Sequence, residues 1–228
     1  SSLDIEQKKL LCDTYESFVR NGANLPDDKK EQLRKVSAEL GVLSLQFSQN
    51  TLKAINAYTL HITDDRQLAG LPESAIDLAK DTAKEEKLEG YVFTLQAPSY
   101  GPFMTYCSDR ELRRKMWMAY NTMCTDGEHS NVEIVKKIVN LHREIAQLLG
   151  YETYADYTLV HRMAETTSNV YNLLNNLIDA YMPTAREEVA EIEAMARKLD
   201  GEDFVLQPWD FGYYSNKLKE ERYNINSE

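Results

Sequence analysis

The sequence has few cysteines and no long apolar run, and each shortage excludes a class of protein. Its three cysteines, Cys12, Cys107 and Cys124, form no CxxC pair. A sparse, odd set of this kind indicates reduced thiols in a reducing compartment rather than a disulfide scaffold. No apolar run approaches the roughly 18 residues that a membrane helix needs. The first residues, SSLDIEQKK, form no signal-peptide pattern. We therefore expect a cytoplasmic protein with no membrane partner.

Basic side chains are also in short supply, with 26 Lys and Arg against 37 Asp and Glu and a net charge of −11. Non-specific binding to nucleic acid needs a basic surface, so we expect no nucleic-acid partner. The remaining composition, 43% hydrophobic and 28% charged, is ordinary for a globular protein. A chain of 228 residues can form one substantial domain or two small ones.

The common catalytic motifs are missing as well. No GxSxG, P-loop, GxGxxG or Cys/His nucleophile spacing occurs. The stretch NLHREIAQLLGY places His142 near Glu144, and zinc peptidases use His and Glu on a helix. Their HExxH motif needs a second His four residues after the first, but Ala146 occupies that position. Residues two apart point about 200° from each other on a helix, so His142 and Glu144 cannot bind one ion.

The other three histidines also favour structural roles. His61 is predicted to end a helix, and His129 lies in the loop DGEHSN near Asp126. His161 and Glu165 are four residues apart and are predicted to form a weak ion pair without the further ligand that a metal needs. We predict no catalytic and no metal-binding residue in the chain. A self-contained metal or carboxylate enzyme using His129, His142 or His161 is the least favoured alternative.

Hydrophobic spacing predicts a mostly helical chain. In residues 108–123, Asp109 is the expected N-cap, and Leu112, Met116, Trp117 and Tyr120 form the expected buried face. Pro183 is expected to kink or split the long helix near the C-terminus. The helices are predicted at residues 3–20, from Pro26 through 33–60, 73–87, 108–123, 131–149, 154–163, 167–199 and from about 208 to 223.

One short strand is predicted near residues 91–95, where GYVFTL holds β-favouring side chains. The following APSYGPF is predicted to be a loop, with Ser99 capping a short turn. A lone strand has no partner in this prediction, which suggests that its partner lies elsewhere in a longer protein. The fold class is therefore all-α, mostly long antiparallel helices with one short strand.

Fourteen tyrosines are an unusual feature, and several lie in GYVFTLQAPSYGPFMTY and WDFGYY. A tyrosine has a rigid apolar body and a polar tip, which suits it to gripping a peptide or a base. Packing at helix ends is the favoured alternative. The candidates to face a peptide are the loop APSYGPF, which contains Tyr100, and Tyr213 and Tyr214, although no substrate-binding residue is assigned.

Five stretches point, in order, to a known family: ELGVLSLQFSQNTL, LAGLPES, GYVFTLQAPSYGPFMTYCSDRELRRKMWMAY, LLGYETYADYTLVHRMAET and QPWDFGYYSNKLKEERYNI. Together they resemble the middle of the thimet oligopeptidase family of zinc metallopeptidases, in particular its bacterial peptidyl-dipeptidase and oligopeptidase A branch. The resemblance covers nearly the whole chain.

This resemblance implies a cytosolic, almost entirely helical zinc peptidase that cuts short peptides. The family's HExxH, its third zinc ligand and its transition-state Tyr and His follow the PWD…YY helix, and no HExxH occurs here. We therefore expect residues 1–228 to be a single helical fragment that lacks the zinc-binding part, is inactive alone and holds no zinc. The alternative function is a non-catalytic helical module for protein interaction.

Overall fold

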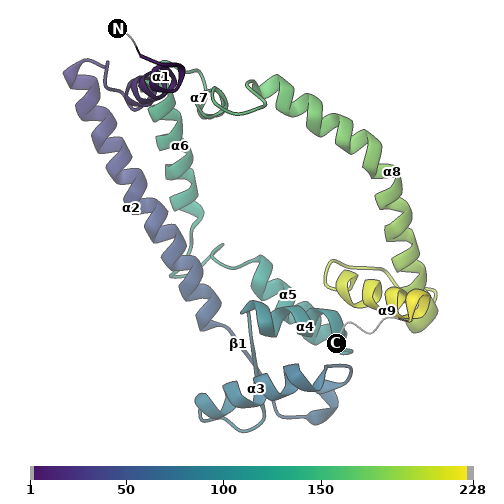
Figure 1. Cartoon of the computed structure of the whole chain (residues 1–228). Helices are drawn as coiled ribbons and strands as arrows, with labels where there is room; N and C mark the ends of the chain where they lie inside the picture. The colour runs from purple at the N-terminus through teal and green to yellow at the C-terminus, as the bar shows by residue number, and fades with distance from the viewer. Residues whose placement is uncertain (1–2, 225–228) are drawn as a thin grey trace. The chain divides into compact units, whose positions relative to one another are not determined.

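The computed structural model describes residues 3–224, and these residues are mostly helical, as predicted. They contain nine α-helices, one short 3₁₀ helix and one two-stranded sheet (Figure 1). The elements are α1 (Ile5–Arg20), α2 (Asp27–Ala57), β1 (Thr59–Ile62), η1 (Asp65–Leu68), α3 (Glu73–Glu85), β2 (Tyr91–Thr94), α4 (Ala97–Tyr106), α5 (Arg110–Asn121), α6 (Val132–Leu148), α7 (Tyr154–Leu159), α8 (Thr167–Asp200) and α9 (Phe211–Tyr223).

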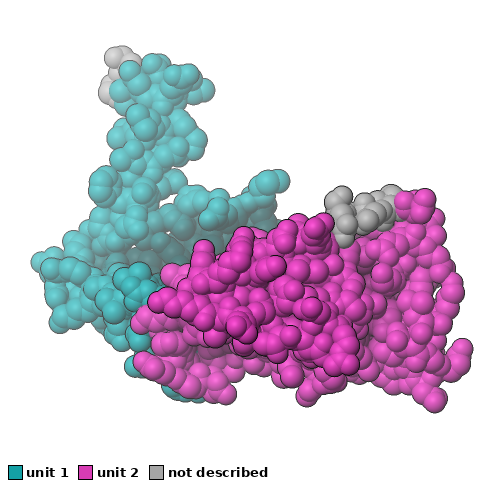
Figure 2. All heavy atoms as spheres, turned by 90° about the horizontal axis from the view of Figure 1, so that it is seen from below, with its two compact units in different colours: residues 1–49, 131–177 teal, residues 50–130, 178–228 magenta. Residues whose placement is uncertain are grey.

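The chain divides into two compact units, coloured separately in Figure 2. Unit 1 comprises residues 1–49 and 131–177, and unit 2 comprises residues 50–130 and 178–228. Each unit is therefore built from two separate parts of the chain.

Local sequence sets the helix ends where polar caps are available. The Asp4 carboxylate accepts a hydrogen bond from the Gln7 amide at 2.8 Å, and the Gln7 side chain accepts one from the Asp4 amide, which forms a capping box at α1. Asp109 accepts from the Leu112 amide at 3.0 Å and caps α5, as predicted. Pro183 lies inside α8, which continues as one helix from Thr167 to Asp200 rather than splitting.

Unit 1 contains a small apolar cluster where α2 and α6 meet. Its buried members are 6–9% exposed, and Leu33, Leu40, Ile138, Leu149 and Tyr154 pack against them. Gly22 forms the turn between α1 and α2 with φ +88°, and a Cβ there would lie 2.6 Å from Leu33 Cδ2. The buried members are Val36, Leu43, Ile134, Leu141 and Ile145.

Unit 2 is organised around the antiparallel pair of β1 and β2, in which Thr59 lies opposite Thr94 and Ile62 opposite Tyr91. The expectation that the strand at 91–95 has no partner in this chain is therefore wrong. The error arises because Thr59 and Leu60 follow directly on the apolar stripe of α2 and fall within the helix predicted at 33–60. Four residues are too few for periodicity to distinguish helix from strand.

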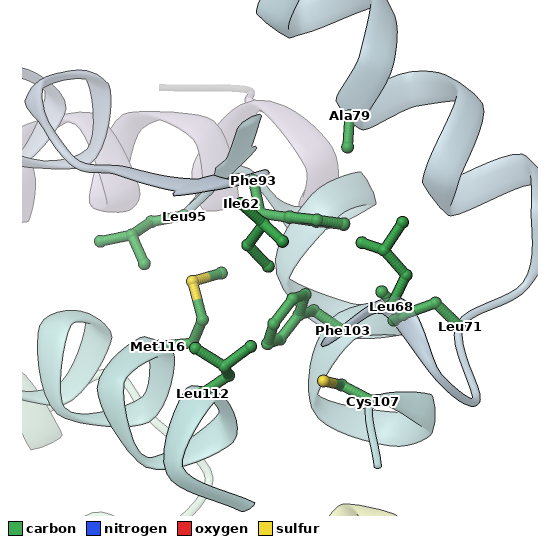
Figure 3. Packing of buried hydrophobic residues seen from close by; sticks show 10 residues of the cluster. All are labelled: Ile62, Leu68, Leu71, Ala79, Phe93, Leu95, Phe103, Cys107, Leu112 and Met116. Atoms are coloured by element: carbon green, nitrogen blue, oxygen red, sulfur yellow. The ribbon is translucent and has the colours of Figure 1, made fainter. Parts of the chain in front are cut away.

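The main core of unit 2 gathers between this sheet and helices α3, α4 and α5 (Figure 3). Phe93 and Phe103 are fully buried and meet edge to face, with ring centroids 4.7 Å apart. Ala75, Ala79 and Ala83 give α3 a buried face of small side chains, so that the helix packs closely on β2. The buried members of the core are Ile62, Leu68, Leu71, Ala79, Phe93, Leu95, Phe103, Cys107, Leu112 and Met116.

The predicted loop APSYGPF is also wrong, because residues 97–106 form helix α4. Pro98 lies in the first turn, where its missing N–H has no partner to lose, and Pro102 lies inside the helix. Ser99 is buried and accepts a hydrogen bond from the Thr94 amide at 3.0 Å, so it links α4 to the end of β2. Burial of Phe103 in the core outweighs the weak helix propensity of glycine and proline.

Candidate functional site

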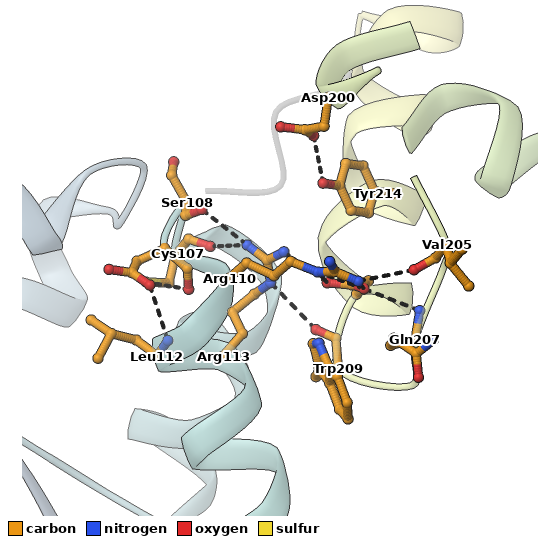
Figure 4. Close-up of polar contacts among 12 residues, drawn as sticks. Cys107, Ser108, Arg110, Leu112, Arg113, Asp200, Val205, Gln207, Trp209 and Tyr214 are labelled. Atoms are coloured by element: carbon orange, nitrogen blue, oxygen red, sulfur yellow. Dashed lines mark hydrogen bonds and ion pairs between the residues drawn. The ribbon is translucent and has the colours of Figure 1, made fainter. Parts of the chain in front are cut away.

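The most elaborate polar arrangement in the described residues lies in unit 2, where α5 faces the segment that leads into α9 (Figure 4). Arg110 and Arg113 are three residues apart on α5 and therefore share one side of that helix. Both reach the carboxylate of Asp210, the residue before α9. We call Arg110, Arg113 and Asp210 the arginine–aspartate cluster.

The Asp210 carboxylate is fully buried and has four donor atoms around it. Arg110 Nε lies 3.1 Å from both oxygens and its Nη2 lies 2.7 Å from Oδ2. Arg113 Nη2 donates to Oδ1 at 3.0 Å, and the Gln207 amide donates to Oδ2 at 3.0 Å. The two-point contact of Arg110 with both oxygens is the geometry in which a guanidinium binds a carboxylate most strongly.

Arg113 is only 1% exposed, and backbone carbonyls accept most of its remaining donors. Nη1 donates to the carbonyls of Cys107 at 2.7 Å and Ser108 at 3.2 Å, and Nε donates to that of Trp209 at 3.3 Å. Its guanidinium also lies 4.2 Å from the ring centroid of Tyr213. Arg113 thus ties the start of α5 to the segment before α9.

Arg110 is more exposed and makes the outer contacts of the cluster. Its Nη2 donates to the Val205 carbonyl at 2.9 Å, and its guanidinium lies 4.2 Å from the ring centroid of Phe204. The hydrogen bonds to Asp210 raise the pKa of Arg110, so its positive charge is secure.

Tyr214 completes this region through a separate contact. Its hydroxyl donates to Asp200 Oδ2 at 2.5 Å, and its ring packs edge to face on Phe204 at 5.1 Å. Burial, followed by the bond to Asp200, raises the pKa of Tyr214. The side chain is 2% exposed, so Tyr214 makes packing contacts within unit 2.

The cluster has the chemistry of a structural brace. Asp210 is already bound by two arginines and a backbone amide, which leaves it unsuited to accept a substrate proton. Removing one partner from a buried ion pair leaves an uncompensated charge and costs about 3–5 kcal/mol. The arrangement therefore ties the start of α9 to α5 and is expected to keep one geometry.

The other tyrosine candidates also make packing contacts. Tyr100 is half-buried against the main core, and its ring stacks on Tyr120 with centroids 4.4 Å apart. Tyr120 is 42% exposed and does not complete the buried face of α5 as predicted, whereas Leu112 and Met116 do. Tyr213 meets Arg113, as described above.

The structure separates His142 from Glu144 in the way that the helix geometry predicts. The His142 ring contacts the Tyr154 ring, with centroids 4.0 Å apart, while Glu144 accepts a hydrogen bond from Gln32 at 2.7 Å. His142 Nδ1 is buried and has no hydrogen-bond partner among the described residues.

Two predictions about the remaining histidines are wrong. His61 lies in β1 rather than at a helix end, and its Nε2 donates to the Glu89 carbonyl at 2.6 Å. His161 lies 4.0 Å from Glu16 and not beside Glu165, because α7 ends at Leu159 and helical spacing no longer applies. His129 is half-buried and lies in the loop that follows α5 in the sequence.

Ligands for a metal do not gather anywhere in the part of the chain that the structure describes. Among residues 3–224, no group of three or more His, Cys, Asp or Glu side chains is arranged to hold an ion. No helix among these residues is long and apolar enough to cross a membrane.

Comparison with known sequences defines the class of protein to which this fold belongs. Peptidase family M3 matches residues 103–228, which include the whole arginine–aspartate cluster, and the chain belongs to this family. The resemblance inferred from the five stretches is thereby confirmed.

Among individual relatives, oligopeptidase A of Escherichia coli strain K12 is 39% identical over 233 residues that cover all of this chain and 34% of that protein. The probable cytosolic oligopeptidase A of Arabidopsis thaliana is 33% identical over 236 residues, again covering all of this chain and 34% of that protein. Dipeptidyl carboxypeptidase of E. coli K12 is 29% identical over 225 residues, covering 98% of this chain and 33% of that protein. The chain spans about a third of the length of the curated relatives that it matches.

The arginine–aspartate cluster is not predictable from the sequence. A weak signal exists in RELRRKM, where Arg113 lies between Leu112 and Met116 in a stretch that must bury one side. Nothing local links it to Asp210, which is 97 residues away.

Proposed function

We propose that the chain forms part of a zinc-dependent oligopeptidase or peptidyl-dipeptidase that hydrolyses peptide bonds in short peptides. One observation carries the proposal: oligopeptidase A of E. coli matches this chain from end to end at 39% identity. The family membership and the mostly helical fold support the same class of enzyme.

The role proposed for these 228 residues is structural. The described residues offer no set of metal ligands, so they do not fit zinc on their own, and we derive no chemical step through the metal. Zinc would be held by residues of a longer protein in which this chain is one helical part. The arginine–aspartate cluster would then fix the packing of α9 in that protein.

Two further parts of the proposal concern surroundings and partners. We propose a cytoplasmic location, and the printed name of one relative, the probable cytosolic oligopeptidase A of A. thaliana, supports it. Short peptides are the proposed partners of the whole enzyme. The net charge of −11 supports the expectation that nucleic acid is not a partner.

The test begins with the gene that contains this sequence. We expect its reading frame to encode HExxH, and its purified product to cleave a short fluorogenic peptide in a reaction that a chelator stops and zinc restores. A matched variant with Gln in place of the motif's Glu should bind zinc but lose hydrolysis, since that Glu would take the proton from water. Mass spectrometry of the products would distinguish internal cleavage from release of C-terminal dipeptides.

The competing hypothesis, a non-catalytic helical interaction module, predicts a different outcome. The reading frame would then lack HExxH, and the product would show no chelator-sensitive hydrolysis. That result would overturn the proposed function even though the chain belongs to the family.

A further inference from the structure

A hollow of about 490 Å³ opens in unit 1, beside the turn that joins α1 to α2. The end of α6 and helix α7 form its other walls. Its volume lies within the roughly 300–1,000 Å³ typical of sites that bind small molecules. All of its lining residues belong to unit 1.

The charge of this hollow is opposite to that of the chain. Arg20, Lys30 and Arg34 line it, and its described lining includes no Asp or Glu, although the chain as a whole has a net charge of −11. Asp27 lies 3.8 Å from Lys30, and Glu31 pairs with Arg34, but both acids are outside the lining. Exposed pairs along a helix are weak, so they leave these cations available to a ligand.

Arg20 is the innermost of the three cations and is held in place by α7. Its Nη2 donates to the Tyr157 carbonyl at 2.9 Å, and its guanidinium lies 4.7 Å from the centroid of the Tyr157 ring. Its Nη1 is buried and has no hydrogen-bond partner among the described residues. A buried donor without an acceptor is costly, and an anionic oxygen bound in the hollow would supply the missing acceptor.

Apart from Asn21 and Ser37, the other side chains of the wall are apolar or aromatic. Tyr154 and Tyr157 lie with ring centroids 5.6 Å apart, and Leu33 and Leu149 also line the hollow. An inorganic ion alone would leave this apolar surface uncovered. A ligand that carries a flat apolar body next to its charge would use both halves of the site.

We propose that the hollow in unit 1 is a binding site for a small organic anion, in which a carboxylate or phosphate group meets Arg20, Lys30 and Arg34 and an aromatic body lies against Tyr154 and Tyr157. The inference does not depend on the proposed peptidase function, because it rests only on residues of this chain.

Titration calorimetry and saturation-transfer NMR on the 228-residue chain provide the test. The probes are phenyl phosphate, phenylacetate, inorganic phosphate and neutral benzyl alcohol. We expect both aromatic anions to bind more tightly than inorganic phosphate or benzyl alcohol, and to weaken as salt is raised. Whichever aromatic anion binds more tightly identifies the preferred charged group.

Variants localise the binding. The double variant K30Q/R34Q should weaken the tighter probe by about tenfold or more, since it removes two charged partners from exposed positions. The matched control is K35Q, which removes a charge from the same helix at a residue outside the lining. R20K keeps the positive charge but replaces the planar guanidinium, with its paired N–H donors, by an ammonium group. It should weaken binding more than K35Q does. Circular dichroism checks that each variant retains its helix content.

Three results would overturn the proposal. The first is no binding of either aromatic anion at millimolar concentration. The second is equal binding of phenyl phosphate by the chain and K30Q/R34Q. The third is binding of benzyl alcohol as tight as that of the anions, which would make the hollow an apolar surface without anion preference.

Discussion

The core of unit 2 contains large apolar side chains that are completely buried, whereas every buried member of the unit 1 cluster remains partly exposed. Phe93, Phe103 and Met116 in unit 2 are 0% exposed, but the five buried members of the unit 1 cluster are 6–9% exposed. Helix α1 has no buried residue, and its Leu10 and Phe18 are 69% and 64% exposed.

The difference shows two ways in which a helical chain is held in shape. Unit 2 combines a dense core, a short sheet and a buried ion cluster, each of which specifies one arrangement. Unit 1 depends on helix caps and a thin apolar seam, so less burial opposes its conformational entropy. Apolar side chains exposed as a group mark surfaces suited to interaction. We expect unit 2 to be the more stable unit.

The largest expected effect is in the arginine–aspartate cluster. Replacing Asp210 with Asn keeps the shape but removes the charge that compensates Arg110 and Arg113. We expect a loss of about 3–5 kcal/mol in the free energy of unfolding. Urea titration followed by tryptophan fluorescence measures it, because both tryptophans, Trp117 and Trp209, lie in unit 2. The control E111Q removes an exposed carboxylate from α5, the helix that carries both arginines, and should change stability little. A loss below about 1 kcal/mol in D210N would show that the cluster is not a brace.

The second prediction contrasts a buried and an exposed thiol. Burial raises the pKa of Cys107 in unit 2 from the ordinary 9.0 to about 11. Both states hold the proton below pH 9, and the unfolded state alone loses it between pH 9 and 11, so stability falls as pH rises through that window. The linked loss is at most about 3 kcal/mol.

The measurement is urea unfolding at pH 8 and pH 10.5 for the chain and for C107A. The variant should be less stable at pH 8 but lose less between the two pH values. The C12A control, which replaces an exposed thiol of unit 1, should match the parent chain. Equal losses of unfolding free energy between pH 8 and 10.5 in all three proteins would show that burial of the Cys107 thiol is not the cause.

The third prediction tests the two units directly by hydrogen exchange. Amides in α1 should exchange at least about tenfold faster than those in α5, because α1 has no buried residue and α5 contributes Leu112, Arg113 and Met116 to the interior. Mass spectrometry of peptides from the two helices measures the ratio. Equal protection would mean that the whole chain opens as one unit.

The smallest effect is expected for Tyr214→Phe, which removes the hydroxyl that donates to Asp200. We expect a loss of about 1 kcal/mol in the free energy of unfolding, the usual value of one hydrogen bond. Tyr171 in unit 1 is 66% exposed, and Y171F serves as the control with almost no change. A neutral Y214F would assign the stabilisation of this region to ring packing on Phe204 instead.

Sequence alone predicted the helices whose apolar spacing and caps agree, such as α5 with Asp109 as its N-cap. It failed where tertiary packing overrides local preference: α4 contains Gly101 and Pro102 but is a helix because its Phe103 enters the core. It also failed at β1, which is too short to show a period and depends on β2, about 30 residues later, for its hydrogen bonds.

The polar features were harder to predict than the helices. The absence of HExxH can be read directly from the sequence. The pairing of Arg113 with Asp210 cannot, because the two residues are 97 positions apart in the chain. Nothing in the order of residues indicates that the turn at Gly22 brings Arg20 toward Lys30 and Arg34 in one hollow.

We propose that these 228 residues form a helical part of a family M3 peptidase and that its zinc chemistry requires residues outside them. Elemental analysis of the purified chain, prepared without chelator and dialysed, combined with a short-peptide hydrolysis assay, tests it most directly. This proposal predicts negligible zinc and no hydrolysis. Stoichiometric zinc with chelator-sensitive hydrolysis would contradict it, and the metal site would then have to be sought among His129, His142 and His161.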